Sequence, residues 1–310
     1  MKNVYKRLSH RLAAFRSLTG MTVPEFNNLY EKVKNKIGDH LLESLEKKDR
    51  QRAVGAGGVY KNDVRNRLLM TIIWLRIYAT YEVLGFLFDL HKSNVCRNMQ
   101  AILEILEEEL ADEISWPNKE KRQKMRMADF MKEFSDVVAI IDATEQPIQR
   151  PQDNDEQKDH YSGKKKQHTL KKQIIVTPYG EIIHVSKTEP DSKSDKKIFD
   201  ESDPGDMEEE DAFMGDKGYQ GIQHDHYTIL PDKKPKGKEL EPEKKARNKR
   251  ISSVRIVVEH TFGKVKNYQA VSQKFQHPRD KHDAIFAVVA GLVNRQIRSR
   301  IEQNVEGSFA

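Results

Sequence analysis

The chain has 310 residues, enough for one large or two ordinary domains, and 37% of them are hydrophobic, which suffices for a real core. Lys and Arg number 54 against 48 Asp and Glu, a net charge of +6, and this excess weakly favours a polyanionic partner. The single cysteine, Cys96, excludes an internal disulfide and a cysteine-based zinc site, and the longest apolar stretch, 68–75, is too short to cross a bilayer, so we expect an intracellular protein with no membrane partner.

The N-terminal third is helical by pattern. Thr22 and Glu25 form a predicted capping box at the start of a helix. A glycine-rich linker at 53–58 separates this helix from a second apolar one around 68–75. The first helix presents apolar residues at spacings of three and four on one face: Phe26, Leu29, Val33 and Ile37.

Two short helices at about 80–106, joined by a tight polar turn, form a pattern typical of a helix-turn-helix. Thr80 and Ser93 are the predicted N-caps. A helical hairpin with a solvated face fits the same segment, and its residues alone leave both interpretations open. In a helix-turn-helix, the exposed face of the second helix carries residue types that bond phosphates and base edges: Lys92, Asn94, Arg97 and Asn98.

The composition turns polar around 112–128, and Pro117 interrupts the helical pattern there. We therefore place a domain boundary in this region. The expected organisation is a helical domain at 1–116, a linker at 117–130, a domain of strands and helices at 131–303, and a tail at 304–310.

After this boundary the hydrophobic period changes from that of a helix to that of strands. The run VVAIID (137–142) is typical of a strand buried on both faces, and we expect it to end on Asp142. A strand, a Pro/Gly turn and a second strand are predicted at 173–185. A short helix at 195–199 and a short strand reaching Asp216 follow, then a strand at 228–231.

The C-terminal part begins with a basic, proline-containing segment at 233–250. A helix follows it, and a final helix is predicted at 283–301. The first of these two helices has an apolar stripe at spacings of three and four: Ile251, Val254, Val258, Phe262 and Val265.

Three carboxylates stand out by position: Asp142, Asp216 and Glu259, each in a different element. If the fold brings them together, mutual repulsion favours cations among them. Oxygen ligands suit Mg²⁺ or Mn²⁺, and two such ions support in-line displacement at phosphorus, the chemistry of nucleases and strand transfer. Taken singly, each acid also fits a solvated strand or helix end. Glu145 is either a neighbour of this site or part of a turn.

Several basic residues are candidates for contacts with a DNA backbone near these acids. Arg255 and Lys266 lie one to two turns from Glu259 on its helix face, although Arg255 and Glu259 also fit an ordinary i,i+4 ion pair. Further lysines cluster before and within the strand region, where a solvated loop is the alternative interpretation: Lys164, Lys165, Lys166, Lys171 and Lys172.

The segments IIDATEQPIQRP, YSGKKKQHTLK, MGDKGYQGI and VRIVVEHTFGKVK resemble the DDE-type transposases of bacterial insertion sequences. The closest similarity is to the fifth insertion-sequence family, which is related to the Harbinger-type transposases of eukaryotes. LTGMTVPEFNNLY and TYEVLGFLFDLHKSNVCRNM resemble the helix-turn-helix domain that precedes the catalytic domain in these proteins. The resemblance covers nearly the whole chain.

This resemblance implies that Asp142, Asp216 and Glu259 are a metal-binding catalytic triad in a ribonuclease H-like fold, a mixed sheet flanked by helices, at 131–303. The implied cofactors are two Mg²⁺ or Mn²⁺ ions, and the implied partner is double-stranded DNA, at the element's ends and at the target. An oligomer assembled on DNA is expected, as is a cytoplasmic, nucleoid-associated location in a bacterium. The family's Tyr three residues before Arg255 is replaced here by Ser252.

Two other functions fit the sequence. A domesticated metal-dependent DNA endonuclease would use the same acids without strand transfer. A catalytically silent DNA-binding protein would use the helix-turn-helix alone, but the presence of all three acids at their motif positions argues against it.

Overall fold

The structure is a computed structural model in which five stretches of the chain are described: residues 3–46, 63–126, 133–202, 208–237 and 239–307. The predicted linker at 53–58 lies outside these residues, and so do parts of the predicted linker at 117–130 and of the tail at 304–310. In the described parts, no helix combines the length and the apolar character needed to cross a membrane.

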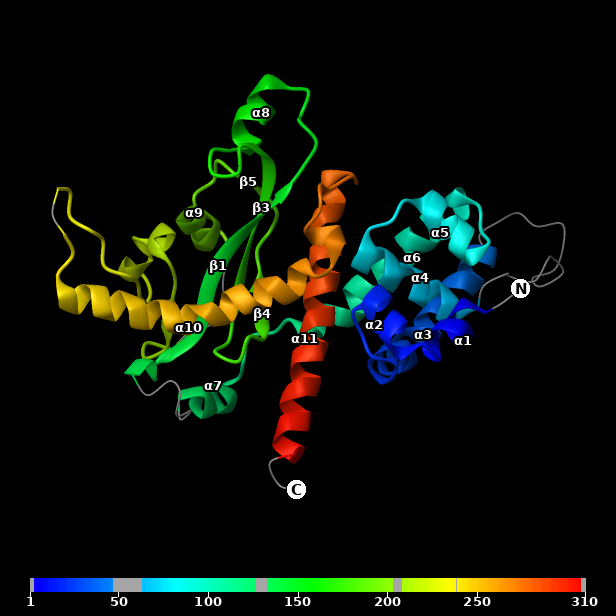
Figure 1. Ribbon diagram of the computed structural model, residues 1–310, viewed down its shortest axis with the longest axis horizontal. Helices are drawn as coiled ribbons and strands as arrows, with labels where there is room; N and C mark the ends of the chain where they lie inside the picture. Colours follow the sequence, from blue (N-terminus) through cyan, green and yellow to red (C-terminus); the bar gives the residue numbers. More distant parts are fainter. Residues whose placement is uncertain (1–2, 47–62, 127–132, 203–207, 238, 308–310) are drawn as a thin grey trace. The chain divides into compact units, whose positions relative to one another are not determined.

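The chain divides into two compact units, coloured along the sequence in Figure 1. The first unit comprises Met1–Asp112, Asn267–Gln273 and Ala284–Leu292, and the second comprises Glu113–Lys266, Lys274–Asp283 and Val293–Ala310. The first unit is helical, with these elements in chain order: α1 (Val4–Ser9), α2 (Leu12–Thr19), α3 (Val23–Glu46), α4 (Val64–Ile77), α5 (Tyr81–Phe88) and α6 (Lys92–Leu110).

The predicted capping box is confirmed at the start of α3. The Thr22 N–H donates to a Glu25 carboxylate oxygen over 2.7 Å, and the Glu25 N–H donates to the Thr22 hydroxyl oxygen over 3.3 Å. The apolar stripe of α3 and much of α4, including Leu68, Ile72 and Leu75, are fully buried. Local capping and apolar periodicity therefore determine this unit's helices.

Helices α5 and α6 form the predicted helix-turn-helix, joined by a tight turn at 89–91. Thr80 caps α5 as predicted, through its hydroxyl and the Val83 N–H. The prediction that Ser93 caps α6 is wrong: α6 starts at Lys92, and the His91 side chain accepts from the Ser93 N–H. The turn is closed by the Leu90 N–H, which donates to the Gly85 oxygen over 2.8 Å.

The second unit contains one mixed sheet, which has seven strands within the described residues. The strands are β1 (Val137–Pro147), β2 (Tyr161–Ser162), β3 (Gln167–Val176), β4 (Ile182–Val185), β5 (Glu189–Pro190), β6 (Ala212–Met214) and β7 (Thr228–Ile229). The α-helices that accompany the sheet are α7 (Lys119–Arg126), α8 (Asn154–His160), α9 (Asp195–Asp200) and α10 (Pro242–Lys266). The last helix, α11 (His282–Gly307), contributes residues to both units.

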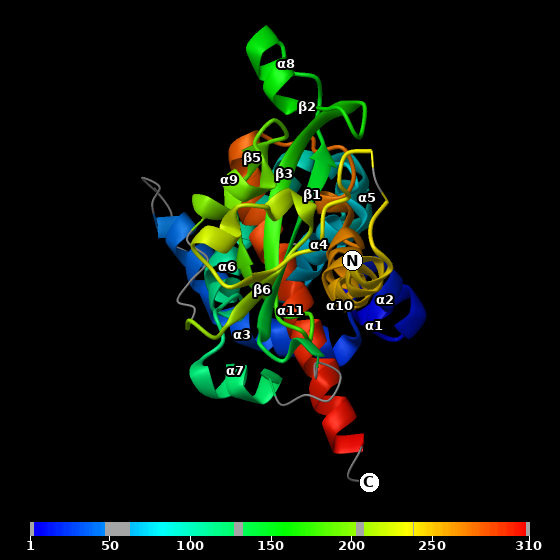
Figure 2. The same cartoon turned by 90° about the vertical axis from the view of Figure 1, so that its left-hand side faces the viewer.

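The strand order is β2-β3-β1-β6-β7, with β4 and β5 also paired to β3. β1 is central: it runs antiparallel to β3 and parallel to β6. β3 and β4 are antiparallel, as the strand–turn–strand pattern predicts, and β6 and β7 are parallel. Figures 1 and 2 show the sheet with α9 on one side of β1 and β3 and α10 on the other. The expectation of a mixed sheet flanked by helices is confirmed.

β1 is longer than predicted, and Asp142 lies within it rather than at its end. Antiparallel pairing with β3 continues from Asp142, opposite Ile174, to Pro147, opposite Thr169. Pairing with β6, in contrast, stops at Ile140, opposite Met214. The apolar run ends at the point where β1 loses its neighbour on one side, not where the strand itself ends.

α10 is also longer than predicted, because it begins at Pro242, inside the basic segment expected at 233–250. Residue 238 of that segment lies outside the described part of the chain. From the predicted apolar stripe, Ile251, Val258 and Val265 are fully buried and Phe262 is nearly so. Val254 is only half-buried.

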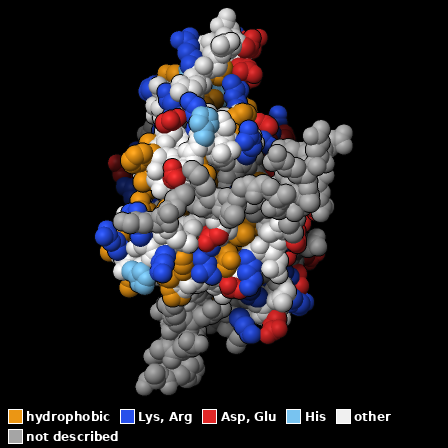
Figure 3. Space-filling model, turned by 90° about the vertical axis from the view of Figure 1, so that its right-hand side faces the viewer, with side chains coloured by type: hydrophobic (Ala, Val, Ile, Leu, Met, Phe, Trp, Pro, Cys, Tyr) orange, Lys and Arg blue, Asp and Glu red, His pale blue; other side chains and the backbone are white. Residues whose placement is uncertain are grey.

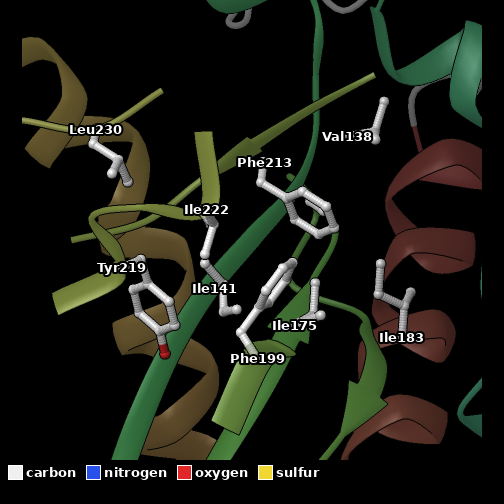
Figure 4. Close-up of a cluster of buried hydrophobic side chains, with 10 residues drawn as sticks. Val138, Ile141, Ile175, Ile183, Phe199, Phe213, Tyr219, Ile222 and Leu230 are labelled. Atoms are coloured by element: carbon white, nitrogen blue, oxygen red, sulfur yellow. The ribbon is translucent and has the colours of Figure 1, made fainter. Parts of the chain in front are cut away.

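A cluster of buried apolar side chains forms the core on the α9 side of the sheet (Figure 4). Phe213 from β6 packs edge-on against Phe199 from α9, with ring centroids 5.1 Å apart. Ile141 from β1 and Tyr219, which follows β6, belong to the same cluster. This core fixes the ends of β1 and β6 relative to α9.

Candidate active site

Asp142 lies in β1, two residues beyond the last pairing with β6, with a side chain that is 23% exposed. Burial raises its pKa from 3.8 to about 6. The Arg255 guanidinium and a hydrogen bond from the Ala143 N–H, 2.9 Å long, lower the pKa, while the charges of Asp216 and Asp195 raise it further. A carboxyl group whose ionised form is disfavoured by its surroundings, and which has other acids nearby, is a candidate functional residue.

Asp216 follows the last residues of β6 and caps the short helix η3 (Lys217–Tyr219). Its carboxylate accepts a hydrogen bond from the Gly218 N–H over 2.7 Å. A Cβ on Gly218 would lie 2.9 Å from Asp216 Oδ1 and 2.7 Å from Asp195 Oδ2, so a larger residue at this position would displace one of the two carboxylates. The same sheet end therefore presents Asp142 and Asp216, whose charges interact.

Glu259 is exposed and lies on α10 between two basic residues that interact with Asp142. Arg255 Nη2 is 3.7 Å from Asp142 Oδ2. The pKa of Lys266 is lowered by burial and by the charge of Lys165. The charges of Asp142 and Glu145 oppose this effect only in part. At about 100° per residue, Arg255, Glu259 and Lys266 fall within about 40° of one another around the helix. Glu259 therefore belongs to the stripe of α10 that faces Asp142.

α10 is held in place next to Glu259 by buried contacts. The Thr261 hydroxyl is fully buried and donates to the Gly180 oxygen over 3.0 Å, in the turn between β3 and β4. Val258 is also fully buried. Glu259 is thus an exposed residue within a segment of the helix whose opposite face is buried.

The acids supply only oxygen ligands, which fit Mg²⁺ or Mn²⁺. Over the described part of the chain, no three carboxylate, imidazole or thiol groups lie close enough to hold a metal ion together. Asp142 and Asp216 interact directly through their charges, whereas Glu259 shares their neighbourhood through Arg255 and Lys266. The donor chemistry fits a divalent ion whose remaining ligands are water.

Asp195, at the start of α9, is a neighbour of this site that the sequence did not indicate. In the sequence it is an ordinary acid in the first turn of a short helix, and nothing there distinguishes it from Asp200. Glu145 lies in β1 opposite Lys171, and its carboxylate accepts from the Thr169 hydroxyl over 3.4 Å. It is therefore a strand residue and not part of a turn.

The predicted DNA-contacting lysines fall into two groups. Lys164, Lys165 and Lys166 are exposed in the turn between β2 and β3, as a DNA contact requires. The prediction for the other two is wrong. Lys172 is 2% exposed and pairs with Asp283, and Lys171 Nζ lies 3.3 Å from Asp195 Oδ1. Both point into the protein because β3 alternates between two covered faces.

In the helix-turn-helix, Lys92, Asn94 and Arg97 are exposed on α6, and Arg97 Nη1 donates to Asn94 Oδ1 over 2.9 Å. Asn98 does not belong to this exposed face, contrary to the prediction. It is 4% exposed, and its amide donates to the Arg67 oxygen over 3.2 Å. On the molecular face drawn in Figure 3, basic, acidic and apolar side chains are intermingled.

Comparison with known proteins supplies a family for both units. A family model described as "DDE superfamily endonuclease" matches residues 141–294, and one described as "Helix-turn-helix of DDE superfamily endonuclease" matches residues 63–112. A probable transposase for insertion sequence element IS702 from Microchaete diplosiphon is 30% identical over 284 residues, which cover 91% of this chain and 94% of that protein. No solved structure matches.

Proposed function

We infer the function from the family: this chain belongs to the DDE superfamily of endonucleases and to its transposases. We propose that it binds the terminal inverted repeats of its own insertion sequence. It then carries out hydrolysis and strand transfer at the ends of these repeats. It combines a helix-turn-helix DNA-binding domain with a DDE endonuclease domain. Hydrolysis would free the 3′-hydroxyls at the element ends. These hydroxyls would then attack target DNA at the same site.

In this proposal Asp142, Asp216 and Glu259 hold two divalent ions. Such ions activate a water or hydroxyl and stabilise the leaving oxygen of an in-line displacement at phosphorus. The observation that carries the proposal is the 3.7 Å approach of Arg255 to Asp142, because it brings the helix of Glu259 to the end of the sheet where Asp142 and Asp216 interact.

Two basic side chains of α10 are proposed to orient the DNA. Arg255, with a side chain that is 13% exposed, has an Nε that is buried and finds no hydrogen-bond partner among the described residues. The part of the guanidinium that remains exposed is suited to a phosphate oxygen, which it can bind through its other N–H groups. Lys266 would grip a second phosphate, since burial lowers its pKa and a negative partner would favour its charged form.

The strand pairing supports assigning the sheet to a ribonuclease H-like fold. Along β4-β3-β1-β6-β7, the first three strands are antiparallel and the last two run parallel to β1. We assign the catalytic domain to 131–303 and the DNA-binding domain to 1–116.

The proposed partner is double-stranded DNA at the element's ends and at the target. Asn94 on α6 would reach base edges, and Arg97 and Lys92 would contact phosphates. Lys164, Lys165 and Lys166 would contact the DNA backbone near the acids. Because transposition joins two element ends, we propose that the chain works as a homo-oligomer assembled on DNA.

The experiment is cleavage of a labelled duplex carrying the element's own flanking DNA, with Mg²⁺, with Mn²⁺ or with chelator. Metal-dependent cuts at the repeat ends are expected for the wild type and for Glu243→Gln, a matched exposed glutamate of the same helix. Glu259→Gln should bind the duplex and fail to cut it. Activity surviving in Glu259→Gln would refute the triad. Cutting without joining would identify a domesticated endonuclease, and binding without cutting would identify a silent descendant.

A further inference from the structure

Asp195 and Asp216 converge on one side of a single glycine. Asp216 Oδ1 and Asp195 Oδ2 would lie 2.9 and 2.7 Å from a Cβ built on Gly218. The Gly218 N–H holds the Asp216 oxygen at 2.7 Å. The charges of both Asp195 and Asp216 act on Asp142. Three acids from β1, α9 and the turn after β6 thus share one neighbourhood.

The cationic side chains near these acids neutralise the negative charges of the carboxylates only in part. Lys171 Nζ lies 3.3 Å from Asp195 Oδ1, yet the geometry is not that of a hydrogen bond, and this buried oxygen has no such partner within the described chain. Arg255 forms an ion pair with Asp142 in which Nη2 and Oδ2 are 3.7 Å apart. Like charges held this close favour a bound cation.

Tyr219 provides an independent sign of a ligand at this place. Its side chain is fully buried, and its hydroxyl finds no hydrogen-bond partner in the described residues. Figure 4 shows the hydroxyl pointing away from Phe213 and Leu230. Burial raises its pKa, and the charges of Asp195, Asp142 and Asp216 raise it further, so the hydroxyl lies in the electric field of these acids. A buried donor of this kind requires an acceptor, and ordered water is the usual one.

We propose that Asp195 joins Asp142 and Asp216 in holding a hydrated divalent cation, with the Tyr219 hydroxyl hydrogen-bonded to water on that ion. Among the described residues no three acids lie close enough to bind one ion directly, so at least one of these three must act through water, and we assign that role to Asp195. Mg²⁺ keeps several waters when bound, which matches this arrangement. The inference rests on the proposed function and adds a positioning residue beyond the triad.

The test is a titration of the full chain with Mn²⁺ in the absence of DNA. Binding is measured from the electron paramagnetic resonance signal of the free ion. Asp195→Asn is expected to weaken Mn²⁺ binding about 10–100-fold, the usual effect of removing an outer ligand partner. Tyr219→Phe should weaken it by a smaller factor. Asp225→Asn, at an exposed acid of the same unit, should leave the affinity unchanged.

A second variant separates this role from a structural one. If Asp195 served only as the ion partner of Lys171, Lys171→Met would weaken Mn²⁺ binding as much as Asp195→Asn. Under the proposal, Lys171→Met leaves the affinity within twofold of the wild type or raises it, because a competing cation is removed. Circular dichroism in chelator checks that each variant is folded.

Two results would overturn the proposal: an Asp195→Asn affinity within twofold of the wild type, or equal losses in Asp195→Asn and Lys171→Met. If Asp142→Asn abolishes both Mn²⁺ binding and cleavage while Asp195→Asn changes neither, only the role of Asp195 fails. If the wild type neither binds Mn²⁺ nor cuts DNA with metal, the proposed function fails as well.

Discussion

Asp142→Asn is expected to stabilise the metal-free protein above pH 6 while abolishing metal-dependent cleavage. Burial raises the pKa of Asp142 from 3.8 to about 6, against the opposing effect of Arg255. In the unfolded chain the carboxyl ionises near its ordinary pKa. Above pH 6 the folded protein therefore contains a carboxylate that its surroundings disfavour, whereas asparagine imitates the protonated side chain.

The magnitude follows from the size of the pKa shift. A shift of about 2 pH units corresponds to about 3 kcal/mol of unfolding free energy. This is an upper value because the side chain is 23% exposed, and we expect a gain of about 1–3 kcal/mol at pH 8. Since the folded pKa is raised, wild-type stability falls as pH rises from about 4 through 6. The difference between variant and wild type should vanish below pH 4.

The assay is urea unfolding in chelator, read from the fluorescence of Trp116 in a Trp74→Phe background. Trp116 packs against the core cluster of the second unit, with its ring 6.2 Å from that of Phe213. Asp225→Asn is the matched control at an exposed position. Equal urea midpoints for Asp142→Asn and the wild type at pH 8, or the same gain at pH 4 and pH 8, would refute the reasoning. Added Mg²⁺ should narrow the gap by stabilising only the wild type.

Two further predictions concern the helix-turn-helix unit. Gly85→Ala is expected to destabilise it by about 1–3 kcal/mol, because a Cβ there would lie 2.4 Å from the Leu90 backbone oxygen. Gly38→Ala, where a Cβ would meet nothing within 4 Å, should stabilise it by about 0.5–1 kcal/mol. Urea unfolding monitored by Trp74 fluorescence measures both changes, and similar effects at the two sites would contradict the close approach at Gly85. Arg97→Ala is expected to weaken binding to all DNA sequences alike and to reduce the slope of log affinity against log salt by about 1, measured by fluorescence anisotropy at several KCl concentrations; an unchanged slope would show that Arg97 contacts no phosphate.

Most features governed by neighbours in the sequence were predicted from the sequence, although the cap of α6 is His91 and not Ser93. The capping box at Thr22, the cap at Thr80 and the apolar stripe of α10 were identified correctly, because caps and helical periodicity depend on residues within about two turns of each other. The family was identified in the same way, from short motifs around the acids. The assignment of Asp142, Asp216 and Glu259 rests on those motifs and stays a proposal.

Features that depend on partners distant in the chain were decided only by the tertiary structure. β1 continues past Asp142 because β3 pairs with it to Pro147, while its pairing with β6 stops at Ile140. Asn98 is buried because α4 supplies the Arg67 oxygen as its acceptor. Asp195 on α9 lies near Asp216, which follows β6, because both carboxylates lie against Gly218. Strand register and side-chain packing between distant segments set these positions, and a local pattern contains neither.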